Sequence, residues 1–120
     1  MNKTVLIVDD SELVLKIISN KLKKAGYDIL QALDGKQALK LLDGNSIDLL
    51  ITDLNMPEMD GVELINAVRT NPYYQFIPII LFLSDEVPDK RFMKKSGATI
   101  FFDKASMNAQ IVATVKKLIR

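Results

Sequence analysis

Charged and hydroxyl side chains stand just after several short apolar runs of this 120-residue sequence. Asp9 and Asp10 follow the first run, Asp53 and Ser84 follow two later ones, and Lys104 comes shortly after another. Carboxylates bind hard cations such as Mg²⁺, and a carboxylate can also attack phosphorus to form an acyl phosphate. Ammonium and hydroxyl groups suit phosphoryl oxygens. If folding gathers these residues, they form an acidic metal site facing a cationic phosphate clamp.

The absent residue types narrow the chemistry further. The sequence has no Cys, which excludes a disulfide, a thiolate nucleophile and cysteine-bound zinc. It has no His, which excludes an imidazole base and a Ser–His triad. Neither G-x-x-x-x-G-K-[ST] nor G-x-G-x-x-G occurs, so no nucleotide cradle is expected. Any metal must therefore bind oxygen ligands.

The composition is that of an ordinary soluble domain, with 48% hydrophobic and 26% charged residues. Sixteen Lys+Arg against fifteen Asp+Glu give a net charge of +1, which favours neither nucleic acid nor a membrane surface as a partner. No apolar stretch approaches the roughly 18 residues of a membrane span. The first apolar run ends in two acids, unlike a signal peptide. We therefore expect a cytoplasmic protein.

Apolar runs alternate with amphipathic segments along the whole chain. The runs that indicate strands are 5–8, 27–32, 47–52, 79–83 and 99–102. The segments with apolar residues at helical spacing are 13–22, 38–42, 62–68, 88–95 and 111–119. Ser11 is a plausible N-cap and Gly26 a plausible stop for the first helix. Strict β–α alternation predicts a parallel sheet with helices on both faces, and five units are too few for an eight-fold barrel.

A doubly wound sheet places its functional site at the carboxyl ends of the strands. In the strand order 2-1-3-4-5, the first and third strands are neighbours, so Asp9, Asp10 and Asp53 converge. Three adjacent carboxylates raise each other's pKa, and a bound Mg²⁺ would relieve that repulsion. Asp53 stands at the end of the central strand and is the best-placed nucleophile. For any single position a solvated strand end is the simpler interpretation; the joint pattern favours a site.

Three motifs carry a resemblance that covers essentially the whole chain. They are Ile-Val-Asp9-Asp10-Ser, Asp53-Leu-Asn-Met-Pro-Glu-Met-Asp-Gly61, and Lys104 after the last strand. In this order and spacing they resemble the response-regulator receiver domain of two-component signalling. The resemblance implies one receiver domain over residues 1–120. It also implies a flavodoxin-like α/β fold, with a doubly wound five-stranded parallel sheet and five helices.

The resemblance also implies roles for individual residues. Asp53 matches the phosphoacceptor, which receives a phosphoryl group from a histidine kinase, a phosphotransfer protein or a small donor such as acetyl phosphate. Asp10 matches a direct Mg²⁺ ligand, and Asp9 acts mainly through water. Asn55 matches the residue whose backbone carbonyl binds the metal. Lys104 matches the lysine that pairs with the acceptor and then with the phosphoryl group.

A change of surface follows phosphorylation in this family. Phe101 matches the aromatic rotamer switch. The face made by the fourth helix, fifth strand and fifth helix then meets a downstream target protein. The missing His fits this picture, because the donor imidazole belongs to another protein. Such a protein is not an enzyme beyond its own phosphorylation and autodephosphorylation.

Two departures from the family pattern bear on the site. The switch hydroxyl normally stands five residues after the proline that opens the fourth strand, and here that position is Leu83. We favour Ser84 in this role, with a small deletion after it; the alternative is that Leu83 fills the position and the hydroxyl is absent. Proline usually follows the lysine through a cis bond, but here Ala105 does. Because a non-proline cis bond costs about 2.5–4 kcal/mol, either strain is retained or the loop is rearranged.

Three other interpretations stay open at this point. The departures could mark a pseudo-receiver, a binding module without productive phosphorylation. The sequence could also be a receiver excised from a larger regulator or hybrid kinase. An aspartate-nucleophile phosphatase of the haloacid-dehalogenase kind is disfavoured, because the position of its general acid is Asn55. No feature identifies the kinase, target or stimulus.

Overall fold

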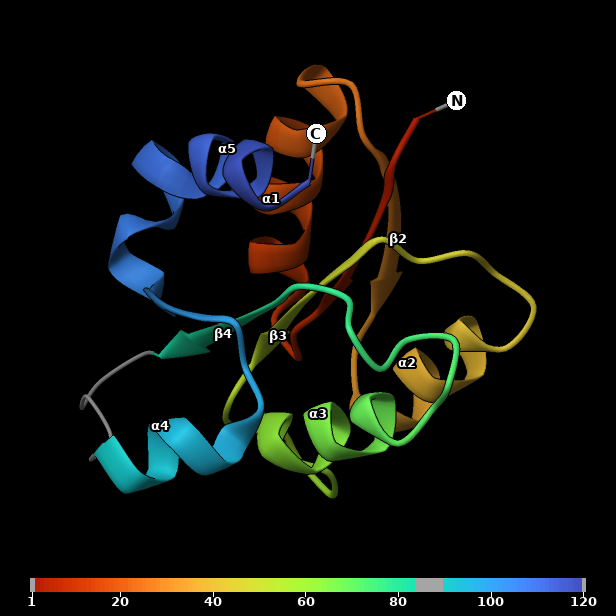
Figure 1. The fold of residues 1–120 in the computed structure, drawn as a ribbon. Coiled ribbons are helices and arrows are strands. Elements are labelled where there is room, and N and C mark those ends of the chain that lie inside the picture. Colours follow the sequence, from red (N-terminus) through yellow and green to blue (C-terminus); the bar gives the residue numbers. More distant parts are fainter. Residues whose placement is uncertain (1, 84–89, 120) are drawn as a thin grey trace.

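The computed structural model describes residues 2–83 and 90–119 (Figure 1). Its centre is a parallel sheet with the strand order β2-β1-β3-β4-β5. The strands are β1 (Thr4–Val8), β2 (Asp28–Ala32), β3 (Leu49–Asp53), β4 (Ile79–Leu83) and β5 (Ile100–Asp103). The predicted α/β class and strand order are confirmed.

Helices cover both faces of the sheet. They are α1 (Glu12–Lys24), α2 (Gly35–Leu42), α3 (Gly61–Arg69), α4 (Lys90–Ser96) and α5 (Met107–Leu118). Figure 1 shows α1 and α5 together on one side of the sheet, with α2, α3 and α4 on the other. Alternate residues of each strand point to opposite faces, so Val5 and Ile7 enter the core under α1 and α5, while Leu6 and Val8 enter the other core. In the described part of the chain, no helix is long and apolar enough to cross a membrane.

Local signals at the ends of the elements explain most boundaries. Ser11 caps α1 by accepting a hydrogen bond from the Val14 N–H at 3.3 Å, and Gly26 follows the helix with φ +100°. The predicted ends of the third and fifth strands were one residue short, since Asp53 and Asp103 pair across the sheet. Hydropathy marks burial, whereas backbone pairing sets where a strand ends. The predicted start of the fourth helix at residue 88 lies outside the described residues.

Arg69, the last residue of α3, ties together two loops at the amino edge of the sheet. Its guanidinium donates to the carbonyl oxygens of Gln75 at 3.0 Å and Ile77 at 2.7 Å, in the loop before β4. It also donates to the carbonyl oxygen of Gly97 from Nε at 3.1 Å and from a terminal nitrogen at 2.9 Å. One side chain therefore fixes both the loop before β4 and the turn before β5.

Candidate functional site

Three carboxylates meet at the carboxyl ends of β1 and β3. The strands pair with Val8 beside Thr52, so Asp9 lies next to Asp53, the last residue of β3. One side-chain oxygen each of Asp9, Asp10 and Asp53 lies within 4.8 Å of the others. Asp9 and Asp53 are buried, whereas Asp10 is exposed. The structure thus brings together the three acids that the sequence placed at this edge.

Lys104, just after β5, reaches into the same cluster. Its Nζ lies 2.9 Å from Asp9 Oδ2 and 3.4 Å from Asp53 Oδ2. The lysine therefore contacts both buried carboxylates, and it lies closer to Asp9 than to the expected acceptor. An ammonium held at this edge can also meet an anionic group that is attached to Asp53.

Backbone hydrogen bonds fix the other oxygen of each buried carboxylate. Asp9 Oδ1 accepts from the Ser11 N–H at 2.9 Å, and Asp53 Oδ1 accepts from the Leu54 N–H at 3.0 Å. The Thr52 hydroxyl donates to the Asp53 backbone carbonyl at 3.0 Å. Sequence reasoning missed these supports. A backbone N–H carries no sequence signal, and Thr52 is a single polar residue at the end of the apolar run 47–52.

Burial and charge shift the ionisation of Asp53 and Lys104. Burial raises the pKa of Asp53, the Asp9 charge raises it further, and Lys104 offsets only part of this rise. Burial alone would lower the pKa of Lys104, but its contacts with Asp9 and Asp53 raise that pKa overall. Lys104 therefore stays an ammonium at neutral pH, while the ionised form of Asp53 is disfavoured. A further positive charge at this edge would favour the ionised carboxylates.

The donor set fits a hard divalent cation. Asp9 Oδ2 is buried and accepts no hydrogen bond from the described residues, although the Lys104 Nζ forms an ion pair with it at 2.9 Å. Such a buried polar atom costs free energy unless a partner satisfies it. The neighbouring ligand atoms are carboxylate oxygens, which are the ligands that Mg²⁺ and Ca²⁺ prefer. A single lysine charge also leaves the three acids incompletely balanced.

Gly61 allows α3 to begin against the backbone at the end of β3. Its N–H donates to the Leu54 carbonyl at 2.8 Å. A Cβ at this position would overlap the backbone oxygen of Asp53 and come within 3.0 Å of Leu54 Cα. Asp60 and Glu63 close the helix start with a reciprocal capping box. The loop between Asp53 and α3 is therefore tightly packed against the end of β3.

The chain after β5 follows a rearranged loop. Lys104–Ser106 form a short 3₁₀ turn, and Asp103 caps it by accepting from the Ala105 N–H at 3.0 Å. The described residues contain no cis peptide bond, so the bond between Lys104 and Ala105 is trans. Of the two alternatives that Ala105 raised, the structure has the rearranged loop, and Lys104 still reaches the acids.

The remaining predicted site residues lie around this cluster. Phe101 is half-buried and packs against the core under α2 and α3, whereas Phe102 points to the opposite core, with its ring 5.8 Å from that of Phe82. Asn55 is exposed in the loop after β3. Ser84, the predicted switch hydroxyl, lies outside the described residues. Leu83, the alternative at that position, is the buried last residue of β4.

The parallel α/β fold, with three carboxylates and a lysine at the carboxyl edge of its sheet, has the features expected of a receiver domain. The sequence model of the response regulator receiver domain matches residues 5–116. The chain belongs to the response regulator receiver domain family, which confirms the resemblance seen in its motifs. It is therefore a receiver domain of the kind found in two-component response regulators.

Relatives and solved structures agree with this assignment. PhoP of Bacillus subtilis, a transcriptional regulatory protein of alkaline phosphatase synthesis, is 32% identical over 120 residues, covering 100% of this chain and 50% of PhoP. The chemotaxis protein CheY1 of Helicobacter pylori is 44% identical over 82 residues, covering 67% of this chain and 66% of CheY1. The chain thus spans half the length of PhoP and about two-thirds of CheY1. The structure of Vibrio cholerae CheY4 has a TM-score of 0.91 at 32% identity, covering 99% of this chain and 100% of CheY4.

Proposed function

We propose that this receiver accepts a phosphoryl group on Asp53 and thereby switches its binding to other proteins. The donor is a partner histidine kinase, a phosphotransfer protein or a small molecule such as acetyl phosphate. The observation that carries the proposal is the convergence of Asp9, Asp10, Asp53 and Lys104 at one edge of the sheet. Membership of the receiver family supports it.

The transfer is a nucleophilic displacement at phosphorus. A side-chain oxygen of Asp53 forms the new bond to phosphorus while the P–N bond of phosphohistidine, or the P–O bond of acetyl phosphate, breaks. The bonding electron pair leaves with the imidazole or the acetate. Lys104 supplies positive charge to the phosphoryl oxygens as the reaction proceeds. Water later attacks the acyl phosphate and releases inorganic phosphate, which restores Asp53. The protein acts only on its own side chain, so we do not class it as an enzyme.

Asp10, Asp53 and the backbone carbonyl of Asn55 would hold a Mg²⁺ ion, with Asp9 acting mainly through water. The bound ion supplies further positive charge against the phosphoryl oxygens. Two properties of this chain support the assignment: the unsatisfied Oδ2 of Asp9 and the raised pKa of Asp53. Both observations support the view that this site carries more negative charge than the single positive charge of Lys104 can balance.

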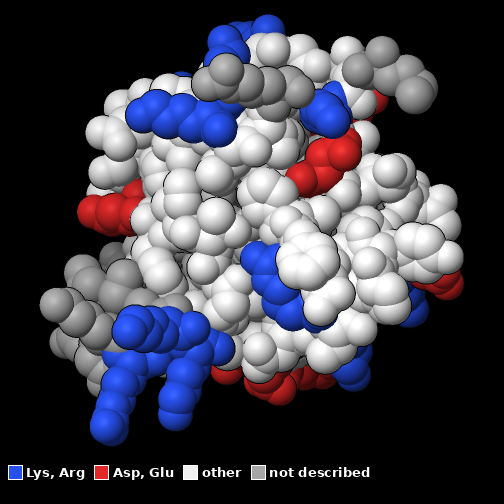
Figure 2. All heavy atoms as spheres, viewed as in Figure 1, with Lys and Arg blue, Asp and Glu red and all other residues white. Residues whose placement is uncertain are grey.

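The output of the switch is a change in a protein-binding surface. We assign that surface to α4, β5 and α5, with Phe101 as the residue that links it to the acceptor and Ser84 as the hydroxyl that contacts the phosphoryl group. Phosphorylation shifts the population between two conformations of this face. Arg91, Lys94 and Lys95 of α4 are exposed, and Figure 2 shows basic side chains gathered at the lower left, over α4. This charge favours a target with an acidic patch.

Intact-protein mass spectrometry tests the acceptor assignment. With acetyl phosphate and Mg²⁺, the wild-type chain gains the mass of one phosphoryl group, and Asp53→Asn does not. Asp28→Asn, an exposed aspartate of β2, serves as the matched control and keeps full uptake. Uptake that survives Asp53→Asn would move the acceptor elsewhere. A folded wild-type chain that takes up no phosphoryl group would be a pseudo-receiver instead.

A Mg²⁺ titration of the unphosphorylated chain tests the metal assignment separately. Loss of one direct ligand in Asp10→Asn weakens binding by roughly tenfold or more, whereas Asp28→Asn leaves it unchanged. Equal affinities of these two variants would place the ion away from the three acids.

A further inference from the structure

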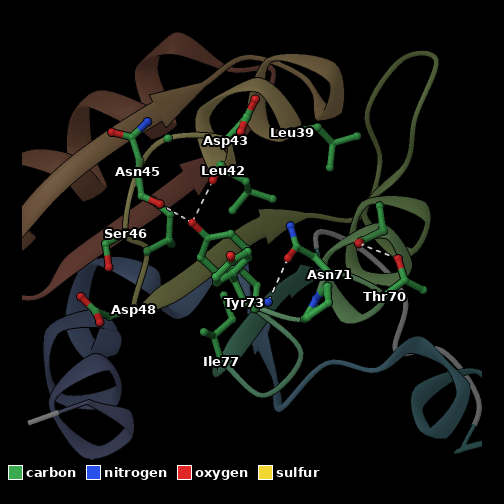
Figure 3. A pocket seen from close by; sticks show the side chains of 15 residues that line it. Leu39, Leu42, Asp43, Asn45, Ser46, Asp48, Thr70, Asn71, Tyr73 and Ile77 are labelled. Carbon is green, nitrogen blue, oxygen red and sulfur yellow. Dashed lines mark hydrogen bonds between the residues drawn. The ribbon is translucent and has the colours of Figure 1, made fainter.

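An open pocket of about 890 Å³ lies at the amino edge of the sheet (Figure 3). It is bordered by the ends of α2 and α3, the segment before β3 and the loop before β4. The Asp53 site occupies the opposite, carboxyl edge. The phosphoacceptor chemistry therefore makes no use of this pocket.

A buried tyrosine holds the floor of the pocket in place. The apolar lining side chains are those of Leu39, Leu42, Ile47, Ala67 and Ile77. Tyr74 is buried among them, and its hydroxyl lies within hydrogen-bond distance of the carbonyl oxygens of Leu42, at 2.8 Å, and of Asn45. Arg69 fixes the far end of the same loop through the carbonyls before β4. These contacts indicate that the pocket is preformed.

The rim of the pocket is acidic. Its lining, which lies wholly within the described residues, includes Asp43 and Asp48 but no lysine or arginine. Neither carboxylate forms an ion pair in the described chain, although Asp48 Oδ2 accepts from the Thr4 N–H at 2.8 Å. Both α2 and α3 end at the pocket, and helix C-termini add partial negative charge. A cationic group is therefore the favoured occupant.

An exposed aromatic ring borders the same opening. Tyr73 is 88% exposed, and its N–H donates to Asn71 Oδ1 at 2.9 Å, which fixes the backbone that carries the ring (Figure 3). Phe76 in the same loop is also 88% exposed but does not line the pocket. An aromatic ring on an acidic rim suits a guanidinium, which carries a positive charge and stacks on rings.

We propose that this pocket binds an arginine side chain of a partner protein, presented in a segment with apolar neighbours. The guanidinium stacks on Tyr73, and the negative charge of Asp43 and Asp48 on the rim attracts it. The methylenes of the arginine and the flanking apolar side chains cover the apolar floor. Lysine is a poorer fit, because its compact ammonium does not stack on a ring.

A pair of blocked peptides tests the proposal by amide chemical shifts of the whole chain. One peptide is Leu-Arg-Leu, and the other replaces arginine with citrulline, its neutral analogue of similar shape. The arginine peptide produces saturable shifts in the amides of 43–48 and 71–77, and raised salt weakens its binding. The citrulline peptide at the same concentration produces no saturable shift.

Matched variants identify the groups responsible. Tyr73→Ala weakens binding of the arginine peptide by about two- to fivefold, the range expected for loss of an exposed cation–π contact, whereas Phe76→Ala leaves it unchanged. Asp43→Asn also weakens binding. The proposal fails if millimolar peptide causes no saturable shift, if citrulline binds equally, or if the shifts centre on another face. Phosphoryl uptake at Asp53 is measured independently of all these outcomes.

Discussion

Lys104→Met removes the cation that lies beside two buried carboxylates. The side chains of Asp9 and Asp53 are 1% and 6% exposed, and that of Lys104 is 21% exposed. Methionine keeps an apolar stem of similar length but has no charge. In the variant, the two acids repel each other in a buried site with no lysine to offset them.

The structure sets both the size and the pH dependence of the effect. Breaking a buried ion pair by removing one partner costs about 3–5 kcal/mol. Because solvent reaches part of Lys104, we expect about 2–3 kcal/mol at neutral pH. Loss of the lysine raises the pKa of Asp53 further above its usual value. The unfolded chain then releases this proton more readily than the folded chain, so the stability of the variant falls as pH rises through the carboxylate range.

Urea unfolding at about pH 7 and about pH 3 measures this cost. At the lower pH, Asp53, whose pKa is raised, is largely protonated, and the penalty shrinks. Lys36→Met is the matched control, because Lys36 pairs with Glu58 at 3.2 Å with both side chains 69% exposed. An exposed pair of this kind contributes about 0–1 kcal/mol. The reasoning is refuted if Lys104→Met costs no more than the control, or costs the same at both pH values.

Three further changes test other parts of the structure. Gly61→Ala should lower the free energy of unfolding in urea by about 1–3 kcal/mol, because the added methyl overlaps the Asp53 backbone. It should also slow phosphoryl uptake. Unchanged stability would mean that α3 shifts at little cost. Arg69→Met should cost about 1–3 kcal/mol, because the guanidinium donates to three backbone carbonyls, and an unchanged melting temperature would show that water replaces those bonds. Tyr74→Phe should cost about 1 kcal/mol in thermal unfolding, because it leaves the buried carbonyl of Leu42 without the hydroxyl donor; a more stable variant would contradict this.

The architecture and the acidic cluster followed from patterns along the chain. Apolar runs buried on both faces mark parallel strands, and in such a sheet the residues after each run share one edge. That argument alone brings Asp9 toward Asp53. The lysine at position 104 belonged to the same edge by the same reasoning, despite the missing proline.

Contacts between loops that are distant in sequence could not be predicted from these patterns. Whether Lys104 lies closer to Asp9 or to Asp53 depends on the path of the turn after β5, which Asp103 caps through its side chain. The Tyr74 hydroxyl meets a carbonyl 32 residues away in sequence, and no periodicity encodes such a pairing. The pocket at the amino edge could therefore not be predicted from the sequence.

Helix α3 connects the carboxyl edge of the sheet with its amino edge. Its first residue, Gly61, abuts the Asp53 backbone, and its last, Arg69, holds the turn that leads into β5. A tilt of this nine-residue rod about its glycine end would displace the arginine and pull on Gly97. Under the proposed phosphorylation of Asp53, a movement at Gly61 would reach the start of β5 through Arg69 and Gly97, by a route separate from the one proposed through Phe101.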